Sequence, residues 1–225
     1  IMKKNRLFAM MAAVAALASC NTTPQVAPAI PQDKEIEAKV EKLIKEMTLE
    51  EKIGQMTQIT ATAIADGLEI TPEGESMIRT NKVGSILNTP GGIAQTPEGY
   101  DKFIQELNRI SIEETGIPTL YGLDHIHGTS YVLGGTLFPQ EINIAASFNR
   151  NHAYNMGMVT AYESRAANVP WTFSPTMDLG RNPEWPRMWE SFGEDTYVNA
   201  QMAVAEVRGM QGEDPNHVGP YHIAA

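Results

Sequence analysis

The chain has 225 residues, one cysteine and a formal net charge of −10, and 42% of its residues are hydrophobic. This length is enough to bury a core, but it is short of the roughly 250 residues typical of a complete (β/α)8 barrel. A strongly acidic chain disfavours nucleic acids and anionic phosphate substrates and is compatible with neutral ligands.

The first residues have the pattern of an export signal. Three basic residues precede an apolar run over residues 7–17, which is long enough for a signal-peptide core and too short to span a bilayer. The run ends in Leu-Ala-Ser-Cys, which resembles a bacterial lipobox. We therefore expect residues 1–19 to be a lipoprotein signal peptide and Cys20 to be lipidated, a modification that anchors stably. Ordinary cleavage near Ala18, with an incidental Cys20, is the alternative.

Residues 20–33 are expected to form the lipid anchor and a flexible linker. The stretch from Asn21 to Gln32 holds three prolines, two threonines and no charge, a composition typical of an extended tether. Apolar residues then repeat at helical spacing from Lys34 to Met47 and predict an amphipathic helix. Thr48 and Glu51 form a capping box that opens a second helix through Met56.

From residue 58 onward, strand-like and helix-like stretches alternate. This pattern is typical of parallel βα units and predicts an α/β fold. The expected strands are 58–60, 83–87, 118–123, 169–174 and 222–225, and the expected helices are one ending near Asn81, one from Thr96 to Gly116, one from Asn149 to Ala167 and one from Asp195 to Met210. The pattern continues to the last residue, so we expect a truncated reading frame rather than a natural terminus.

Two polar stretches follow expected strands. Asp124 comes directly after the strand over 118–123, and its carboxylate accepts two hydrogen bonds from neighbouring hydroxyls; a cap on the following turn is the alternative reading. The loop 180–195 carries arginines, carboxylates and tryptophans, and two prolines within it stiffen it. Such groups suit a polyhydroxylated ring, because charged groups fix hydroxyls and an indole covers the apolar face.

The histidines and the tryptophans of these stretches each admit a functional and a structural interpretation. His125 and His127 alternate, which tempts a metal interpretation, but two histidines without a third placed ligand make a poor site. We therefore expect no metal and a structural role for both. Trp185 and Trp189 are candidate stacking platforms, but buried loop aromatics are commoner, and we leave both out of the site.

Six stretches in register resemble glycoside hydrolase family 3 enzymes of the β-glucosidase type. They are MTLEEKIGQM over 47–56, GIP over 116–118, GLDHIHG over 122–128, TLFPQ over 136–140, FSP over 173–175 and GRNPEWPRMWESFGED over 180–195. The resemblance covers the chain from about Glu35 onward, and it departs from the family pattern at Asn182 and Glu184. It implies that residues 34–225 are the N-terminal part of a (β/α)8 TIM barrel, incomplete in this chain.

The resemblance also implies roles for individual residues. Asp124 and Arg187 would bind the non-reducing sugar, Glu190 would hold Arg187, Arg181 would brace the loop, and His127 would pack beneath the pocket. Neither a metal nor an organic cofactor is implied. Asp178 follows the strand expected over 169–174, and from this position we expect it either to line the pocket or to brace Arg181.

The expected activity is that of a retaining, exo-acting β-glucosidase on oligosaccharides or β-glucosides. In the family, the nucleophile and the acid/base lie beyond the position matching residue 225, so we expect no catalytic residue in this chain. The alternatives are a β-xylosidase or β-N-acetylglucosaminidase of the same family, or a sugar-binding lipoprotein if the chain is complete. The expected location is the periplasm or outer membrane, with membrane contact only through the anchor; Asn21 after Cys20 favours the outer membrane.

Overall fold

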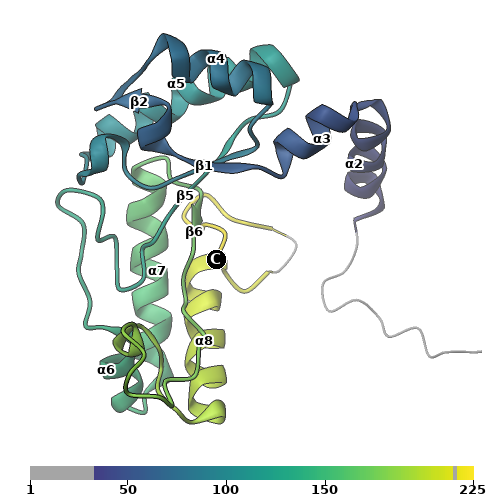
Figure 1. The fold of residues 1–225 in the computed structure, drawn as a ribbon. Coiled ribbons are helices and arrows are strands. Elements are labelled where there is room, and N and C mark those ends of the chain that lie inside the picture. Colours follow the sequence, from purple (N-terminus) through teal and green to yellow (C-terminus); the bar gives the residue numbers. More distant parts are fainter. Residues whose placement is uncertain (1–32, 215–216) are drawn as a thin grey trace, which may run out of the picture.

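The computed structural model describes residues 33–214 and 217–225 (Figure 1). Its helices are α2 (Lys34–Glu46), α3 (Leu49–Gln55), α4 (Pro72–Asn81), α5 (Pro97–Thr115), α6 (Glu141–Ala146), α7 (Arg150–Ala166) and α8 (Thr196–Gln211). Short 3₁₀ turns are η1 (Ala61–Ala63), η2 (Pro90–Gly92) and η3 (Met188–Glu190). The strands are β1 (Gln58–Thr60), β2 (Ala65–Asp66), β3 (Glu69–Ile70), β4 (Ser85–Leu87), β5 (Leu120–Leu123) and β6 (Trp171–Thr172).

The main sheet has four parallel strands in the order β1-β4-β5-β6, which is also their order along the chain. Ile59 pairs with Ile86, which pairs with Tyr121. Beyond β6, Trp171 forms a parallel bridge with Ala224. Parallel strands in sequential order with helices between them are the arrangement of a (β/α)8 barrel. The predicted fold class is therefore confirmed, with part of a barrel present in this chain.

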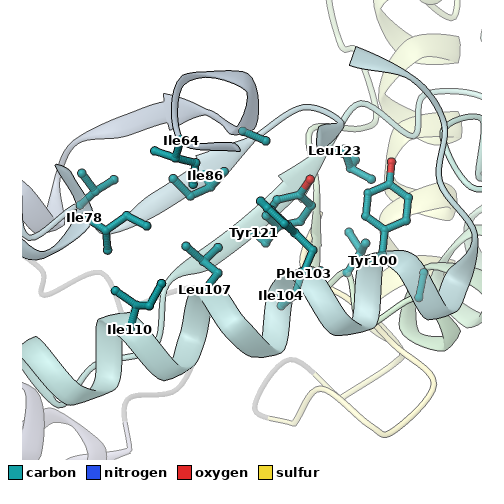
Figure 2. Packing of buried hydrophobic residues seen from close by; sticks show 14 of the residues in the cluster. Ile64, Ile78, Ile86, Tyr100, Phe103, Ile104, Leu107, Ile110, Tyr121 and Leu123 are labelled. Atoms are coloured by element: carbon teal, nitrogen blue, oxygen red, sulfur yellow. The ribbon is translucent and has the colours of Figure 1, made fainter. Parts of the chain in front are cut away.

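A first hydrophobic core joins α5 to the sheet (Figure 2). Phe103 of α5 meets Tyr121 of β5 edge to face, with ring centroids 5.9 Å apart. Leu107 of α5 and Ile86 of β4 are fully buried in the same cluster. Each such side chain contributes roughly 1.5–3 kcal/mol when fully buried. This packing holds α5 across the sheet and fixes where β4 and β5 end.

A second layer is formed by α7 and α8, which pack along each other (Figure 1). Glycines let the two backbones approach closely. A Cβ on Gly157 would lie 2.3 Å from the carbonyl oxygen of Glu206, and one on Gly209 would lie 2.2 Å from that of Tyr154. Any larger residue at either position would push the helices apart.

The helix ends follow the sequence closely. Thr48 and Glu51 form the expected capping box, Thr96 and Gly116 bound α5, Asn149 caps α7 and Asp195 caps α8. The prediction for α2 is also right, and Asp33, assigned to the linker, is its N-cap. None of the residues of α2 is buried, and Ile36, Val40, Leu43 and Ile44 are 44–55% exposed. The apolar face that the pattern predicts is therefore not covered by any of the described residues, and α2 lies to one side of the molecule, beyond α3 (Figure 1).

Strand lengths were predicted less well. The strand expected over 169–174 is only Trp171–Thr172: Pro170 before it has no N–H to donate, and pairing with β5 covers only these two residues. The strand expected from Pro118 begins at Leu120, because Pro118 has no N–H and the N–H of Thr119 donates to Asn108 Oδ1 at 3.0 Å.

The predicted signal peptide over 1–19, the lipidation site Cys20 and the linker up to Gln32 lie outside the described residues. Within residues 33–214 and 217–225, no helix is long and apolar enough to cross a membrane.

Candidate functional site

Asp124 lies directly after the carboxyl end of β5, where the parallel strands of the sheet end together. It is half-buried. Burial raises the pKa of this carboxyl, the charge of Arg187 lowers it, and the charge of Glu190 raises it. These opposing effects show that Asp124, Arg187 and Glu190 share one electrostatic environment, although Asp124 follows β5 whereas Arg187 and Glu190 lie on the later loop 180–195.

The backbone on both sides of Asp124 is held by one hydroxyl of the neighbouring strand. Thr172 Oγ1 donates to the carbonyl oxygen of Leu123 at 3.0 Å and accepts from the backbone N–H of His125 at 3.2 Å. Thr172 is fully buried. The bend that carries Asp124 is therefore tied to β6 on either side of the carboxylate.

Arg187 is held by a bidentate-like contact with Glu190. Its Nη2 lies 2.5 Å from Glu190 Oε2, and its Nε donates to the same oxygen at 2.8 Å. The side chain of Arg187 is 55% exposed, whereas that of Glu190 is 15% exposed. The hydrogen bond that Arg187 donates to Glu190 raises the pKa of Arg187 most, and the charge of Glu190 raises it further. The charges of Asp124 and Asp178 act in the same direction. The structure thus brings Glu190 to Arg187, and it brings the charge of Asp178 to Arg187 as well.

The remaining residues of the loop have separate surroundings. Arg181 is exposed, and its Nε donates to the carbonyl oxygen of Glu194 at 3.4 Å, which links the start of the loop to its end. The expectation that the loop tryptophans are buried is wrong for Trp189, which is 50% exposed. The 3₁₀ turn η3 explains this, because it turns Met188 and Glu190 inward and leaves Trp189 facing out.

The two histidines after Asp124 contact different partners. His127 Nδ1 lies 2.9 Å from the carbonyl oxygen of Phe138. His125 is fully buried, its Nδ1 lies 2.8 Å from Ser164 Oγ, and its ring stacks on Tyr131 with centroids 6.2 Å apart. In the part of the chain that the structure describes, no three or more histidine, cysteine, aspartate or glutamate side chains group as a metal site would require.

Sequence reasoning missed a pocket at the same edge of the sheet, lined by both polar and apolar side chains. It has a volume of about 250 Å³, and its lining includes Thr60, Thr62, Asn88, Thr89, Leu123 and Tyr131. Thr60 ends β1 and Asn88 follows β4. The rule that singled out Asp124, namely a polar residue at a strand end, would also have found these two.

Sequence reasoning also missed two buried carboxyl groups, Glu141 of α6 and Glu206 of α8, both 0% exposed. No spacing rule connects them, since they lie on different helices. They are close enough that the charge of Glu206 raises the pKa of Glu141.

The site can bind hydroxyl groups. It offers a carboxylate acceptor on Asp124 and a guanidinium donor on Arg187, the latter oriented by Glu190. Charge-assisted hydrogen bonds of this kind are about twice as strong as neutral ones.

Comparison with known proteins points to one family. Residues 48–224 match the model of the glycosyl hydrolase family 3 N-terminal domain. A lysosomal β-glucosidase of Dictyostelium discoideum is 38% identical over 193 residues, which cover 80% of this chain and 24% of that protein. A periplasmic β-glucosidase of Salmonella typhimurium is 34% identical over 180 residues, covering 80% of this chain and 21% of that protein.

Solved structures agree. The exo-1,3/1,4-β-glucanase of a Pseudoalteromonas species superimposes with a TM-score of 0.76 at 31% identity, covering 89% of this chain and 25% of that one. A β-glucosidase from Listeria innocua in complex with laminaribiose gives a TM-score of 0.62 at 29% identity, covering 81% of this chain and 24% of that one. The chain therefore spans about a quarter of the length of the relatives it matches.

Proposed function

The chain belongs to glycosyl hydrolase family 3, and from this premise we propose that the full-length protein is an exo-acting, retaining β-glucosidase. It would remove terminal non-reducing β-D-glucosyl residues from oligosaccharides. The observation that carries the proposal is the grouping of Asp124, Arg187 and Glu190 at the carboxyl edge of a parallel sheet. This edge is where barrel enzymes bind their substrates.

In the proposed mechanism, Asp124 and Arg187 bind the terminal sugar. The carboxylate of Asp124 accepts hydrogen bonds from adjacent hydroxyls, and the guanidinium of Arg187 donates to the same ring. Glu190 holds the guanidinium in place by accepting a hydrogen bond from its Nε. Contacts of this kind accelerate the reaction when they tighten as the ring approaches an oxocarbenium-like geometry.

The two reacting carboxyl groups are proposed to lie outside these 225 residues. A retaining glycosidase needs a nucleophile and an acid/base about 5 Å apart. Glu190 is unsuited to either role because Arg187 occupies it in an ion pair. The resemblance to the family implies a nucleophilic aspartate on a later strand and an acid/base in a second domain.

One alternative within the family has a specific observation in its favour. A putative β-xylosidase of Formosa agariphila is 32% identical over 197 residues, which cover 84% of this chain and 26% of that protein. A pentose lacks the exocyclic hydroxymethyl group of glucose, so the two substrates differ by one polar contact.

The full-length protein should be assayed on aryl β-glucoside, β-xyloside and β-N-acetylglucosaminide. We expect the highest kcat/KM on the glucoside, release of single glucose units from the non-reducing end of laminari-oligosaccharides, and the β-anomer as the first product seen by proton NMR. A higher kcat/KM on the xyloside would indicate a β-xylosidase instead of a β-glucosidase. First appearance of the α-anomer would contradict a retaining mechanism. Binding of glucosides without any turnover would instead support a non-catalytic sugar-binding lipoprotein.

We also propose that the protein is lipid-anchored through Cys20 and located in the periplasm or at the outer membrane. The leader pattern supports this, as does the similarity to a periplasmic relative.

A further inference from the structure

Glu141 and Glu206 approach the same short segment from two different helices. Glu141 opens α6 and Glu206 lies within α8, and both side chains are fully buried. Between them runs the segment 174–176, which follows β6 and leads to Asp178 and the loop that carries Arg187.

Each carboxyl group holds this segment by one hydrogen bond. Ser174 Oγ donates to Glu206 Oε1 at 3.0 Å, and the backbone N–H of Thr176 donates to Glu141 Oε1 at 3.2 Å. Ser174 Oγ also lies 3.4 Å from the carbonyl oxygen of Ile126, in the stretch that follows Asp124. The pair therefore holds the segment between the two proposed substrate-binding loops, Glu141 through its backbone and Glu206 through a side chain.

The second oxygen of each carboxyl group has no hydrogen-bond partner in the part of the chain that the structure describes. Glu141 Oε2 and Glu206 Oε2 are buried and make no hydrogen bond among the described residues. Neither carboxyl forms an ion pair with a described lysine or arginine; the charges that act on Glu141 are those of Glu206 and Glu190, both negative, and Ser174 is the polar group that acts on Glu206. Two ionised carboxylates buried without a cation are strongly unfavourable.

We propose that Glu141 and Glu206 retain a proton between them at neutral pH and, in this state, position the 174–176 segment beneath the substrate-binding loop. The unpartnered Oε2 atoms are the place for that proton, because a protonated carboxyl donates a hydrogen bond that an ionised one cannot. Like-charge carboxyl pairs in proteins share a proton for the same reason. The positioning role rests on the proposed β-glucosidase function, whereas the shared proton does not.

The sign of the pH dependence follows from the direction of the shifts. Burial, and then the charge of Glu206, raise the pKa of Glu141, and burial raises the pKa of Glu206. Stability from a group with a raised folded-state pKa is fully present below its unfolded value and is lost as pH rises toward the folded value. Raising the pH therefore leaves two buried negative charges, which repel each other and release the segment.

The test compares the full-length wild type with Glu141→Gln, Glu206→Gln and the double variant. Glutamine keeps the shape and an oxygen that accepts from Ser174 and Thr176, but it does not titrate. Tm is measured from pH 6.5 to 9, and KM for an aryl β-glucoside over the same range. Glu106→Gln is the matched control, because this exposed carboxylate has a lowered pKa and does not titrate in that range.

We expect the Tm of the wild type to fall and its KM to rise as the pH increases. For the double variant we expect a clearly flatter Tm curve and a KM that rises less steeply than that of the wild type. Parallel Tm curves for these two proteins would overturn the shared proton, and equal pH dependence of KM would overturn the positioning role. If EDTA lowers the Tm of the wild type but not that of the double variant, a bound cation rather than a retained proton neutralises the pair, and the proposal of a shared proton is overturned. The Tm measurements need no substrate, so they remain decisive if the protein hydrolyses no glucoside.

Discussion

At the scale of single residues, the environment of Asp124 combines two opposing demands. Half-burial raises the pKa of the carboxyl, while the nearby guanidinium of Arg187 lowers it. The net shift of this pKa is upward, with burial as its largest cause. In a partly desolvated place a carboxyl group binds hydroxyls more strongly, because water competes less there.

Replacing Asp124 by Ala is expected to lower kcat/KM of the full-length enzyme by about 10³-fold, equivalent to roughly 4 kcal/mol. The carboxyl group is half-buried, so a site built around it for a hydroxyl loses much of its transition-state binding without it. Steady-state kinetics on an aryl β-glucoside, with circular dichroism as a control of folding, is the measurement. A well-folded variant with near wild-type kcat/KM would show that Asp124 is a turn cap.

At Arg187, even lysine should fail. Arg187 meets Glu190 through both Nε and Nη2, and an ammonium group cannot reproduce that planar fork. We expect Arg187→Lys to lower kcat/KM at least tenfold. The control is Glu184→Gln on the same loop, where the side chain is exposed, and its kinetics should match the wild type. Equal changes in kcat/KM for Arg187→Lys and Glu184→Gln would contradict a specific role of the Arg187 guanidinium, because any substitution in the loop would then have the same effect.

His125 makes stability depend on pH in the acid range. Burial lowers its pKa from 6.5 to about 4. A lowered folded-state pKa means that the unfolded chain binds the proton first, so stability falls as pH decreases from about 6.5 to 4, by an amount on the order of 3 kcal/mol. Chemical denaturation of wild type and His125→Gln should show a smaller loss in the variant. His152→Gln, at an exposed position of α7, should retain the wild-type slope; the same slope in all three would contradict the assignment.

At the scale of elements, the contact between α7 and α8 depends on Gly157. A methyl group there would lie 2.3 Å from the carbonyl oxygen of Glu206, a backbone atom that cannot rotate away. Gly157→Ala should therefore destabilise the protein by about 1–3 kcal/mol, as overpacking does, despite the better helix propensity of alanine. The matched variant is Asn155→Ala, at an exposed position of the same helix, which should change stability by no more than about 0.5 kcal/mol. Thermal unfolding of both variants decides, and an unchanged Tm for Gly157→Ala would mean that the helices separate freely.

At the scale of the whole molecule, the proposed lipoprotein leader over residues 1–19 predicts where the protein is located. We expect wild-type protein in a Gram-negative host to be lipidated at Cys20 and to fractionate with membranes. Palmitate labelling and intact mass of wild type and Cys20→Ser are the measurements, and the variant should lose the label. Soluble, unmodified wild-type protein would contradict the lipobox interpretation.

Much of the fold was accessible from local patterns. The N-caps of α3, α5, α7 and α8 lie where Thr48, Thr96, Asn149 and Asp195 predicted them, because a cap is decided by hydrogen bonds within three residues. Strand lengths were less accessible, since pairing depends on the neighbouring strand, as the short β6 shows. Within the site, Asp124 was predictable from its position after a strand.

The sequence by itself determined the alternation of strands and helices, the helix ends and the family, because each depends on residues close together in the chain. Three features were decided only by the tertiary structure. Thr172 forms hydrogen bonds on both sides of Asp124, Glu206 lies close enough to Glu141 to raise its pKa, and Trp189 faces outward. The first two join residues on different strands or helices, and their distances depend on how closely α7 and α8 pack and on the register of β5 with β6. No spacing along the chain encodes those distances, since they result from the packing of the whole core.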